Sequence, residues 1–485
     1  MESTIHTHTR PSAGAHTQPT PRGHLVQVVR QEYPRWLNYV IYVMMEIAVI
    51  GSDIQEVVGS AIAITLLSQG AVPVWVGCII TGCDTFTFLA VHYFGVRYLE
   101  MLITALIAVM SVCFFINWGT SWPHSPVEDG RGHTLELLRG LALPTMASYA
   151  ITTAVGTIGA VIMPHNLFLH SGLVLSRKVR RSSPRAINDA IWYNTIESAL
   201  ALAVSFIINL AIVATNFSNF YSPACAELED GPFACLSRAA FNDSGDTGEP
   251  SGYCDLPGGR GPGVCAELGL KGEGAALRQA LGDVALYIWA IGLLAAGQAA
   301  TMTCTYAGQI IMGGCLQIEI SPWKRVALTR AIAHGPALLV ATSTADNPYL
   351  YNTINEYLNV LQSVQLPFAM LPVLHFSLSR PLLGRFVPHR AVLIVSFCMA
   401  LLVLGINFYL VISLVGKNSN PSLLVPALLF GSFYVFVCVC MVWEDLAAAA
   451  AAIEHLLCVR ILGTRLARSA TIENQESEDQ HLAES

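Results

Sequence analysis

Ten long apolar segments, joined by more polar ones, constrain this chain more than any other feature. A helix needs about 20 predominantly apolar residues to cross the hydrocarbon core of a bilayer, and each segment reaches that length. They lie at residues 37–68, 72–94, 98–118, 146–175, 189–215, 279–312, 326–345, 354–376, 391–415 and 423–447. With 12% charged residues and a mean hydropathy of +0.53 over 485 residues, the chain is predicted to be an all-α integral membrane protein of about ten transmembrane helices, and not a soluble domain.

Basic residues alternate between the loops and predict the orientation. They crowd the loop after the fourth apolar segment and mark two later loops, as Arg177, Lys178, Arg180, Arg181 and Arg185, then Lys324 and Arg325, then Arg380, Arg385 and Arg390. The loops between them carry fewer. Because basic loops stay on the cytoplasmic side, both termini are expected inside the cell, and the long loop 216–278 is expected outside or in a lumen.

The contents of loop 216–278 agree with that side. It holds four cysteines, Cys225, Cys235, Cys254 and Cys265, which in an oxidising space would form two disulfides with three possible pairings. Two sequons lie at or in the loop, and of these Asn242 is the better glycosylation candidate because Asn216 is expected very near the membrane.

The ends of the chain differ in composition from the apolar region. Residues 1–23 are polar and contain no apolar run typical of a signal peptide, so they are predicted to be a disordered tail. The predicted transmembrane domain covers residues 24–447, and residues 448–485 are predicted to be a cytoplasmic C-terminal tail.

A helix break is predicted within the fourth apolar segment. Pro164 has no N–H, so the carbonyl of Ala160 loses its helical partner. In hydrocarbon such a carbonyl survives only where it lines a cavity or binds something. The sulfur of Met163 would lie beside it, and an oxygen with a soft sulfur is half of a transition-metal site. Alternatively, this is a plain proline kink in which His165 caps the second half-helix.

Three carboxylates follow one another in the first apolar segment. Glu46, Asp53 and Glu56 are spaced by seven and three residues, which places them on one helix face. Carboxylates in a membrane helix are costly and by default indicate a proton or ion pathway. A structural network is the alternative, most readily for Glu46 near the cytoplasmic end. The candidate charge partners are His165, His170, Arg177 and Arg330.

Four long stretches resemble the NRAMP family of proton-coupled divalent metal transporters, and the resemblance extends over about residues 24–447. They are EIAVIGSDIQEVVGSAIA at Glu46–Ala63, GAVIMPHNLFLHS at Gly159–Ser171, GQAATMTCTYAGQ at Gly297–Gln309 and LNVLQSVQLPFA at Leu358–Ala369. The resemblance implies a LeuT-like helical bundle of the APC superfamily, with inverted repeats and a discontinuous helix at a mid-membrane metal site.

The resemblance also implies roles for single residues. The Ala160 carbonyl, the Met163 sulfur and Asn359 would hold the metal, Fe²⁺ or Mn²⁺, which is cargo and not a cofactor. Protons would pass along Asp53 and Glu56, with Arg330 as countercharge and the histidines of the broken helix, His165 and His170, nearby. Glu46 and Arg177 would form an inner gate. The Gly297–Gln309 stretch is expected to serve packing and gating.

The implied protein is a multi-pass transporter in the plasma membrane or an endosomal or vacuolar membrane, and not an enzyme. Its partners would be divalent metal ions, protons and lipid, with no nucleic acid, and the sequence leaves the oligomeric state open.

One departure from the family pattern keeps alternatives open. The Asp-Pro-Gly-Asn motif of the family's first helix is absent, and His24–Pro34 resembles the end of the family's second helix. The ten predicted spans are therefore expected to match helices three to twelve, and the remaining neutral ligands should bind a dication weakly. The chain is then either a metal transporter or a truncated, non-transporting regulator or sensor. A third reading, a transporter for another substrate such as an amino acid, is disfavoured by Met163 and the three carboxylates.

Overall fold

The computed structural model describes most of the chain between residues 23 and 447. The described residues are 23–83, 96–121, 133–143, 151–177, 179–180, 183–226, 228, 233–243, 250–316, 322–343, 348–417, 421–443 and 445–447. The predicted tails, residues 1–23 and 448–485, therefore lie outside the described residues, except for Gly23.

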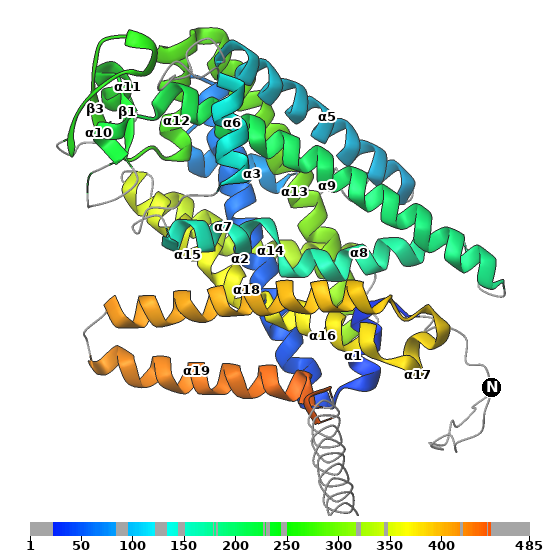
Figure 1. Ribbon diagram of the computed structural model, residues 1–485. Coiled ribbons are helices and arrows are strands. Elements are labelled where there is room, and N and C mark those ends of the chain that lie inside the picture. Colours follow the sequence, from blue (N-terminus) through cyan, green and yellow to red (C-terminus); the bar gives the residue numbers. More distant parts are fainter. Residues whose placement is uncertain are drawn as a thin grey trace, which may run out of the picture.

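Helices form nearly all of the described structure (Figure 1). They are α1 (Leu25–Glu32), α2 (Arg35–Leu67), α3 (Val74–Gly82), α5 (Val96–Ser121), α6 (His133–Ala142), α7 (Ile151–Val161), α8 (Pro164–Ser176), α9 (Pro184–Phe220), α10 (Pro223–Ala226), α11 (Arg238–Asp243), α12 (Leu270–Leu281), α13 (Asp283–Leu316), α14 (Pro322–Ser343), α15 (Pro348–Gln365), α16 (Pro367–Leu378), α17 (Arg380–Leu383), α18 (Arg390–Lys417) and α19 (Pro421–Met441).

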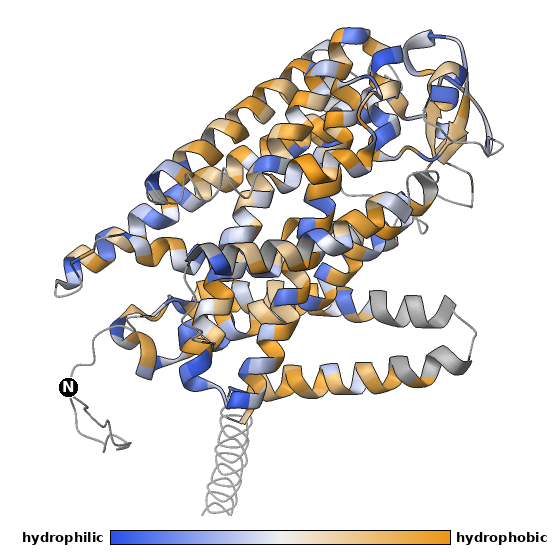
Figure 2. Cartoon of the chain, turned by 180° about the vertical axis from the view of Figure 1, so that it is seen from behind, coloured by the Kyte–Doolittle hydropathy of each residue, from blue (hydrophilic) through white to orange (hydrophobic). Residues whose placement is uncertain are grey.

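Every predicted apolar segment overlaps a helix or a pair of consecutive helices. Among the described residues, 7 helical stretches are both long and apolar enough to cross a membrane. Figure 2 shows apolar residues along most of the helices and hydrophilic ones gathered at helix ends and loops. Large apolar side chains on α9, such as Leu200 and Leu202, are exposed, which suits contact with lipid tails.

Helices α2 and α13 form the centre of the bundle (Figure 1). Of the most apolar 18-residue stretch of α2, 78% is buried, which is the largest share among the described spans. Small residues allow this close packing. A Cβ at Gly297 of α13 would lie 2.1 Å from Ser60 Oγ, and one at Gly77 of α3 would lie 2.9 Å from Ala61. Side chains on α2 therefore face three or more neighbouring helices, which is where a site inside the bundle must form.

One helix break and one weaker helix junction follow from proline. Met163, between α7 and α8, has extended backbone angles (φ −62°, ψ 123°), and Pro164 is the first residue of α8. Helices α15 and α16 meet at Leu366, directly before Pro367, but Leu366 keeps helical backbone angles (φ −55°, ψ −40°). Proline lacks the N–H that a continuous helix needs and is tolerated at a first helical position. The predicted break after Ala160 is therefore present in the fold.

The long loop carries a small sheet that the all-α prediction did not include. Strands β1 (Ala234–Leu236), β3 (Pro262–Ala266) and β2 (Gly252–Asp255) pair antiparallel in that order. Two disulfides hold it together, one joining Cys225 to Cys265 and the other joining Cys235 to Cys254. This is one of the three pairings left open by the sequence. Cys235 of β1 bonds across β3, past Gly263, to Cys254 of β2, and Cys265 of β3 bonds to Cys225 of α10.

Candidate functional site

The helix break lies against α15. A Cβ at Gly156 of α7 would contact Asn359 Cβ at 3.5 Å, and a Cβ at Gly159 would lie only 2.4 Å from the backbone nitrogen of Ser363. At Gly159 such an approach is possible only because the residue is glycine. This contact brings the turn that carries Ala160 close to the turn of α15 that carries Asn359.

A glutamine on α2 holds Asn359 in place. Gln55 Nε2 donates a hydrogen bond to Asn359 Oδ1 at 2.7 Å and another to Asn355 Oδ1 at 2.7 Å, and Gln362 Nε2 donates to Gln55 Oε1 at 2.6 Å. An amide oxygen has two lone pairs, so Asn359 Oδ1 retains one for a further partner. Gln55 was not among the predicted site residues, although a polar side chain between Asp53 and Glu56 in an apolar helix indicates a polar contact inside the bundle.

A second polar junction lies where α2, α8 and α13 meet. Ser52 Oγ donates to Glu56 Oε1 at 2.7 Å and lies 3.5 Å from Met163 Sδ. The thiol of Cys304 lies 3.1 Å from Glu56 Oε1 and 3.3 Å from His165 Nε2. The structure thus joins the predicted carboxylate helix to the predicted sulfur and to the first histidine of the broken helix.

The carboxylates take different positions along α2. Asp53 is 3% exposed, and Glu56 is half-buried at the junction with Cys304. Glu46 lies ten residues before Glu56, about 15 Å along the helix axis, beside Tyr42 and Cys315. The shared face predicted for the three carboxylates therefore contributes only its Asp53–Glu56 end to the neighbourhood of the break.

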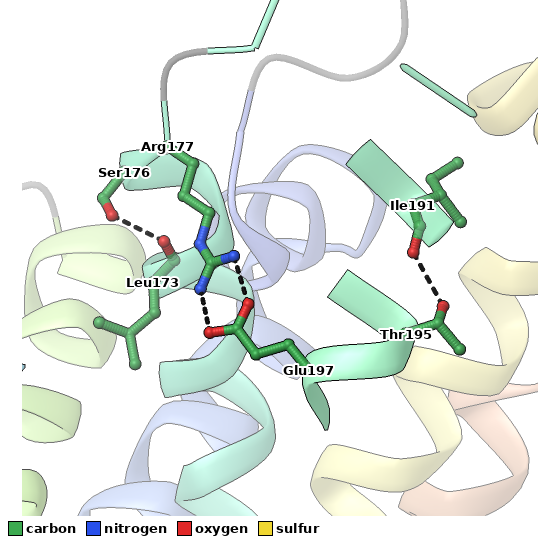
Figure 3. Close-up of polar contacts among 6 residues, drawn as sticks. All are labelled: Leu173, Ser176, Arg177, Ile191, Thr195 and Glu197. Carbon is green, nitrogen blue, oxygen red and sulfur yellow. Dashed lines mark hydrogen bonds and ion pairs between the residues drawn. The ribbon is translucent and has the colours of Figure 1, made fainter. Parts of the chain in front are cut away.

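The predicted gate pair of Glu46 and Arg177 is not formed. Arg177 makes a two-pronged ion pair with Glu197 of α9 instead, with N–O distances of 2.5 Å and 2.7 Å (Figure 3). Arg177 follows the last residue of α8, and α9 turns back beside it, which brings Glu197 nearer than a group on α2. The side-chain hydrogen bond from Arg177 to Glu197 raises the pKa of the guanidinium.

That ion pair lines an open pocket of about 690 Å³. Glu100, His170 and Tyr306 line the same pocket. His170 is exposed, so the structure places the second histidine of the broken helix away from the Cys304 junction. The first, His165, is fully buried. The two histidines, which were predicted to act together, therefore lie on different faces of α8: His165 faces the bundle interior and His170 faces the open pocket.

Arg330 lies in α14, but its side chain is outside the described part of the structure.

Cys304 is a residue at the junction that was not predicted from the sequence. It lies within the Gly297–Gln309 stretch, which was predicted to serve packing and gating only. Gly297 fits that prediction through its contact with Ser60. The sequence did contain a signal for Cys304, because a cysteine that stands among threonines in an apolar helix has polar surroundings.

The structure corrects one prediction for loop 216–278, that of Asn216 as a glycosylation site. Asn216 lies inside α9, its Oδ1 is buried, and its side-chain amide donates a hydrogen bond to Glu273 of α12. A glycan on that nitrogen has no room, so Asn216 is not a suitable acceptor. Asn242, on α11, is exposed and stays a prediction. Burial raises the pKa of the Glu273 carboxyl to about 7, against the smaller opposite effect of the Asn216 hydrogen bond.

Comparisons with known proteins agree on one family. Residues 21–413 match the family described as natural resistance-associated macrophage protein-like. Metal transporter Nramp4 of Arabidopsis thaliana is 39% identical over 416 residues, a stretch that covers 85% of this chain and 72% of that relative. Metal transporter Nramp2 of Oryza sativa subsp. japonica is 38% identical over 422 residues, covering 85% of this chain and 71% of the relative.

A solved structure shares the fold. The crystal structure of a mutant of the Eremococcus coleocola manganese transporter superposes with a TM-score of 0.66 at 24% identity, covering 87% of this chain and 82% of that one. At this identity the match supports the fold of the bundle alone, and the chemistry of the site is argued from this chain's own residues.

Proposed function

The chain belongs to the natural resistance-associated macrophage protein-like family, and we propose that it carries divalent transition-metal ions across a membrane together with protons that move in the same direction. The fold is the LeuT-like helical bundle of that family. One observation supports the proposal above the others: a soft sulfur, Met163, lies at a helix break, 3.5 Å from the Ser52 hydroxyl that bonds to the Glu56 carboxylate. The next turn of the same helix, α2, bonds through Gln55 to the Asn359 amide of α15.

The donor set at the break suits Fe²⁺ or Mn²⁺. The Ala160 carbonyl has no helical donor because residue 164 is proline. Asn359 offers an amide oxygen held by Gln55, and Met163 offers a thioether. Oxygen ligands alone would serve Ca²⁺ or Mg²⁺ equally well, whereas sulfur contributes only with transition metals. The metal is the cargo, so the protein needs no resident cofactor for this role.

The proton route is proposed along α2. Asp53 is buried and Glu56 reaches the junction with His165 through the Cys304 thiol. Ionisable groups inside a membrane bundle mark ion and proton pathways. Arg330 of α14 is the proposed countercharge. We also propose that the Arg177–Glu197 pair, in place of Glu46 and Arg177, acts as the gate at the mouth of the pocket that His170 lines.

The proposed orientation keeps both termini in the cytoplasm and the disulfide-bonded loop outside or in a lumen, in the plasma membrane or an endosomal or vacuolar membrane. Two disulfides in that loop support this side, because such bonds persist in oxidising compartments.

The test is metal uptake in proteoliposomes that contain the purified full chain. Mn²⁺ entry and internal pH would be followed with two dyes in the same vesicles, with an acidic outside as the driving force. We expect saturable Mn²⁺ uptake accompanied by acidification, with a high KM because the ligands at the break are neutral, and still weaker uptake of Ca²⁺. Vesicles with the chain that match protein-free vesicles for Mn²⁺ would reject the proposed function, and uptake without acidification would reject its proton coupling.

A further inference from the structure

Cys304 is the centre of a cluster of metal-ligating side chains that the proposed transport does not require. Its sulfur lies 3.1 Å from Glu56 Oε1, 3.3 Å from His165 Nε2 and 3.4 Å from Ser52 Oγ. The thiol is 1% exposed. A buried free cysteine is usually a small apolar residue packed among others, but Cys304 is surrounded by polar atoms from two other helices.

We propose that Glu56, His165 and Cys304 form a second cation subsite that binds a thiophilic dication, Zn²⁺ or Cd²⁺, through the Cys304 thiolate. Thiolate, imidazole and carboxylate are the three ligand types that zinc takes in proteins. They come from three different helices, α2, α8 and α13, so a bound ion would join the elements around the helix break.

Two of the three separations suit such a cation. For Zn–S near 2.3 Å and Zn–N near 2.0–2.1 Å, two ligands of a tetrahedral ion lie roughly 3.5 Å apart. The separations from Cys304 Sγ to Glu56 Oε1 and His165 Nε2, 3.1 Å and 3.3 Å, are slightly shorter. The Glu56 carboxylate and the imidazole are farther apart, because the three ligand atoms do not all lie within 4.8 Å of one another. An ion that replaces the thiol proton therefore requires the flexible Glu56 carboxylate to swing toward His165.

His165 has the orientation of a ligand toward Cys304, although its other ring nitrogen is unpartnered. The ring is fully buried, and its Nδ1 has no hydrogen-bond partner within the described residues. A buried polar atom without a partner is unfavourable for stability. The imidazole nevertheless keeps its Nε2 directed at the thiol, which is the orientation that a metal ligand requires.

The subsite differs from the cargo site in composition and position. Ser52 Oγ lies between the two sulfurs, 3.5 Å from Met163 Sδ and 3.4 Å from Cys304 Sγ. A thiophilic ion at Cys304 would occupy Glu56 and His165, which the proposed proton route uses. Zn²⁺ or Cd²⁺ would therefore act at this position as a block on the proton route, and Mn²⁺, which gains less from thiolate, would compete poorly for it.

The experiment titrates Cd²⁺ into the purified full chain and records the ultraviolet absorption that arises when a thiolate binds cadmium. We expect a band that saturates with the chain and that is lost in Cys304→Ser and in Cys304→Ala. The matched control is Cys315→Ser, a buried free cysteine of the same helix, which should keep the band. His165→Ala should weaken Cd²⁺ binding on the order of 10–100-fold.

The unaltered chain alone can overturn the inference, because it should show the band whether or not the variants fold. A missing band in the unaltered chain, or a full band in either Cys304 variant, rejects the subsite. Mn²⁺ uptake is measured separately on the same preparation. Uptake without the band rejects the subsite and leaves the transport proposal, whereas the band without uptake rejects transport and leaves the subsite.

Discussion

Gln55 on α2 and Asn359 on α15 are joined by a hydrogen bond of 2.7 Å, in which the glutamine Nε2 donates to the asparagine Oδ1. This bond connects the helix that carries the proposed proton route with the helix that supplies a proposed metal ligand. Because Gln362 in turn donates to Gln55, the orientation of the Asn359 amide depends on a chain of three side chains.

The first prediction concerns that chain. Gln55→Ala should leave Asn359 free to rotate, so that the metal must order the ligand on binding, and the KM for Mn²⁺ should rise on the order of tenfold. The kcat should change less. Gln69→Ala is the control, because the Gln69 side chain bonds to Tyr287 at an exposed position past the end of α2. Kinetics of Mn²⁺ uptake that are equal in the two variants would contradict the role given to Gln55.

Local features of the fold could be predicted from the sequence, because their causes are local. Pro164 dictates the helix break, and the spacing of Asp53 and Glu56 dictates a shared face. Contacts between segments that are far apart in the sequence could not be predicted in this way. The pairing of Arg177 with Glu197 depends on how α9 turns back along α8, and the place of Cys304 depends on the packing of α13 against α2. The disulfide pairing likewise required the register of β1 and β3.

The second prediction concerns metal selectivity. Met163→Ala should reduce discrimination against Ca²⁺ and Mg²⁺, because the thioether adds binding energy for transition-metal ions and not for these hard cations. Mn²⁺ uptake measured against excess Ca²⁺ would show it as a shift of the competition curve toward stronger inhibition. Met312→Ala, at a buried methionine of α13, controls for the loss of a core side chain. An unchanged curve for Met163→Ala would remove Met163 from the cargo site.

The third prediction separates proton flux from metal flux. Asp53→Asn removes a buried carboxylate while keeping its shape, so metal uptake should continue with little acidification of the vesicle interior. The control is Asp189→Asn, at an exposed carboxylate near the start of α9. Acidification per Mn²⁺ ion that is the same in Asp53→Asn as in the unaltered chain would show that protons take another route.

The fourth prediction is a pH dependence of stability from Glu273, which lies outside the spans. Its carboxyl titrates near 4.5 when unfolded, and burial raises its pKa to about 7 in the folded protein. The folded state therefore holds a proton that the unfolded chain has released. The stability from this group is fully present below about pH 4.5 and is lost as the pH rises through about 7.

Glu273→Gln keeps a neutral side chain at every pH. It should raise the unfolding midpoint at about pH 8, by roughly 2–4 °C for each kcal/mol relieved, and have little effect at about pH 4.5. Asp255→Asn, at an exposed carboxylate of the same loop, should change neither. Thermal scans monitored by tryptophan fluorescence would measure this, and a gain that is equal at both pH values would show that Glu273 is not titrating in this range.

The last prediction tests the contact that positions the helix break. A Cβ at Gly159 would lie 2.4 Å from the backbone nitrogen of Ser363, whereas one at Gly156, three residues earlier on the same helix, would lie 3.5 Å from its nearest neighbour. Alanine favours a helix over glycine by about 1 kcal/mol, so Gly156→Ala should be neutral or stabilising. Gly159→Ala meets backbone that cannot move aside as a side-chain tip would.

Overpacking of this kind costs about 1–3 kcal/mol, so Gly159→Ala should lower the apparent unfolding midpoint at a fixed scan rate while Gly156→Ala does not. The displacement should also reduce Mn²⁺ uptake, because α7 carries Ala160 and any shift away from α15 separates its carbonyl from Asn359. Two variants with the same midpoint and the same uptake would mean that α7 does not lie against Ser363. The cargo site built from Ala160 and Asn359 would then have to be abandoned, whereas the Cys304 subsite, which involves neither residue, would remain.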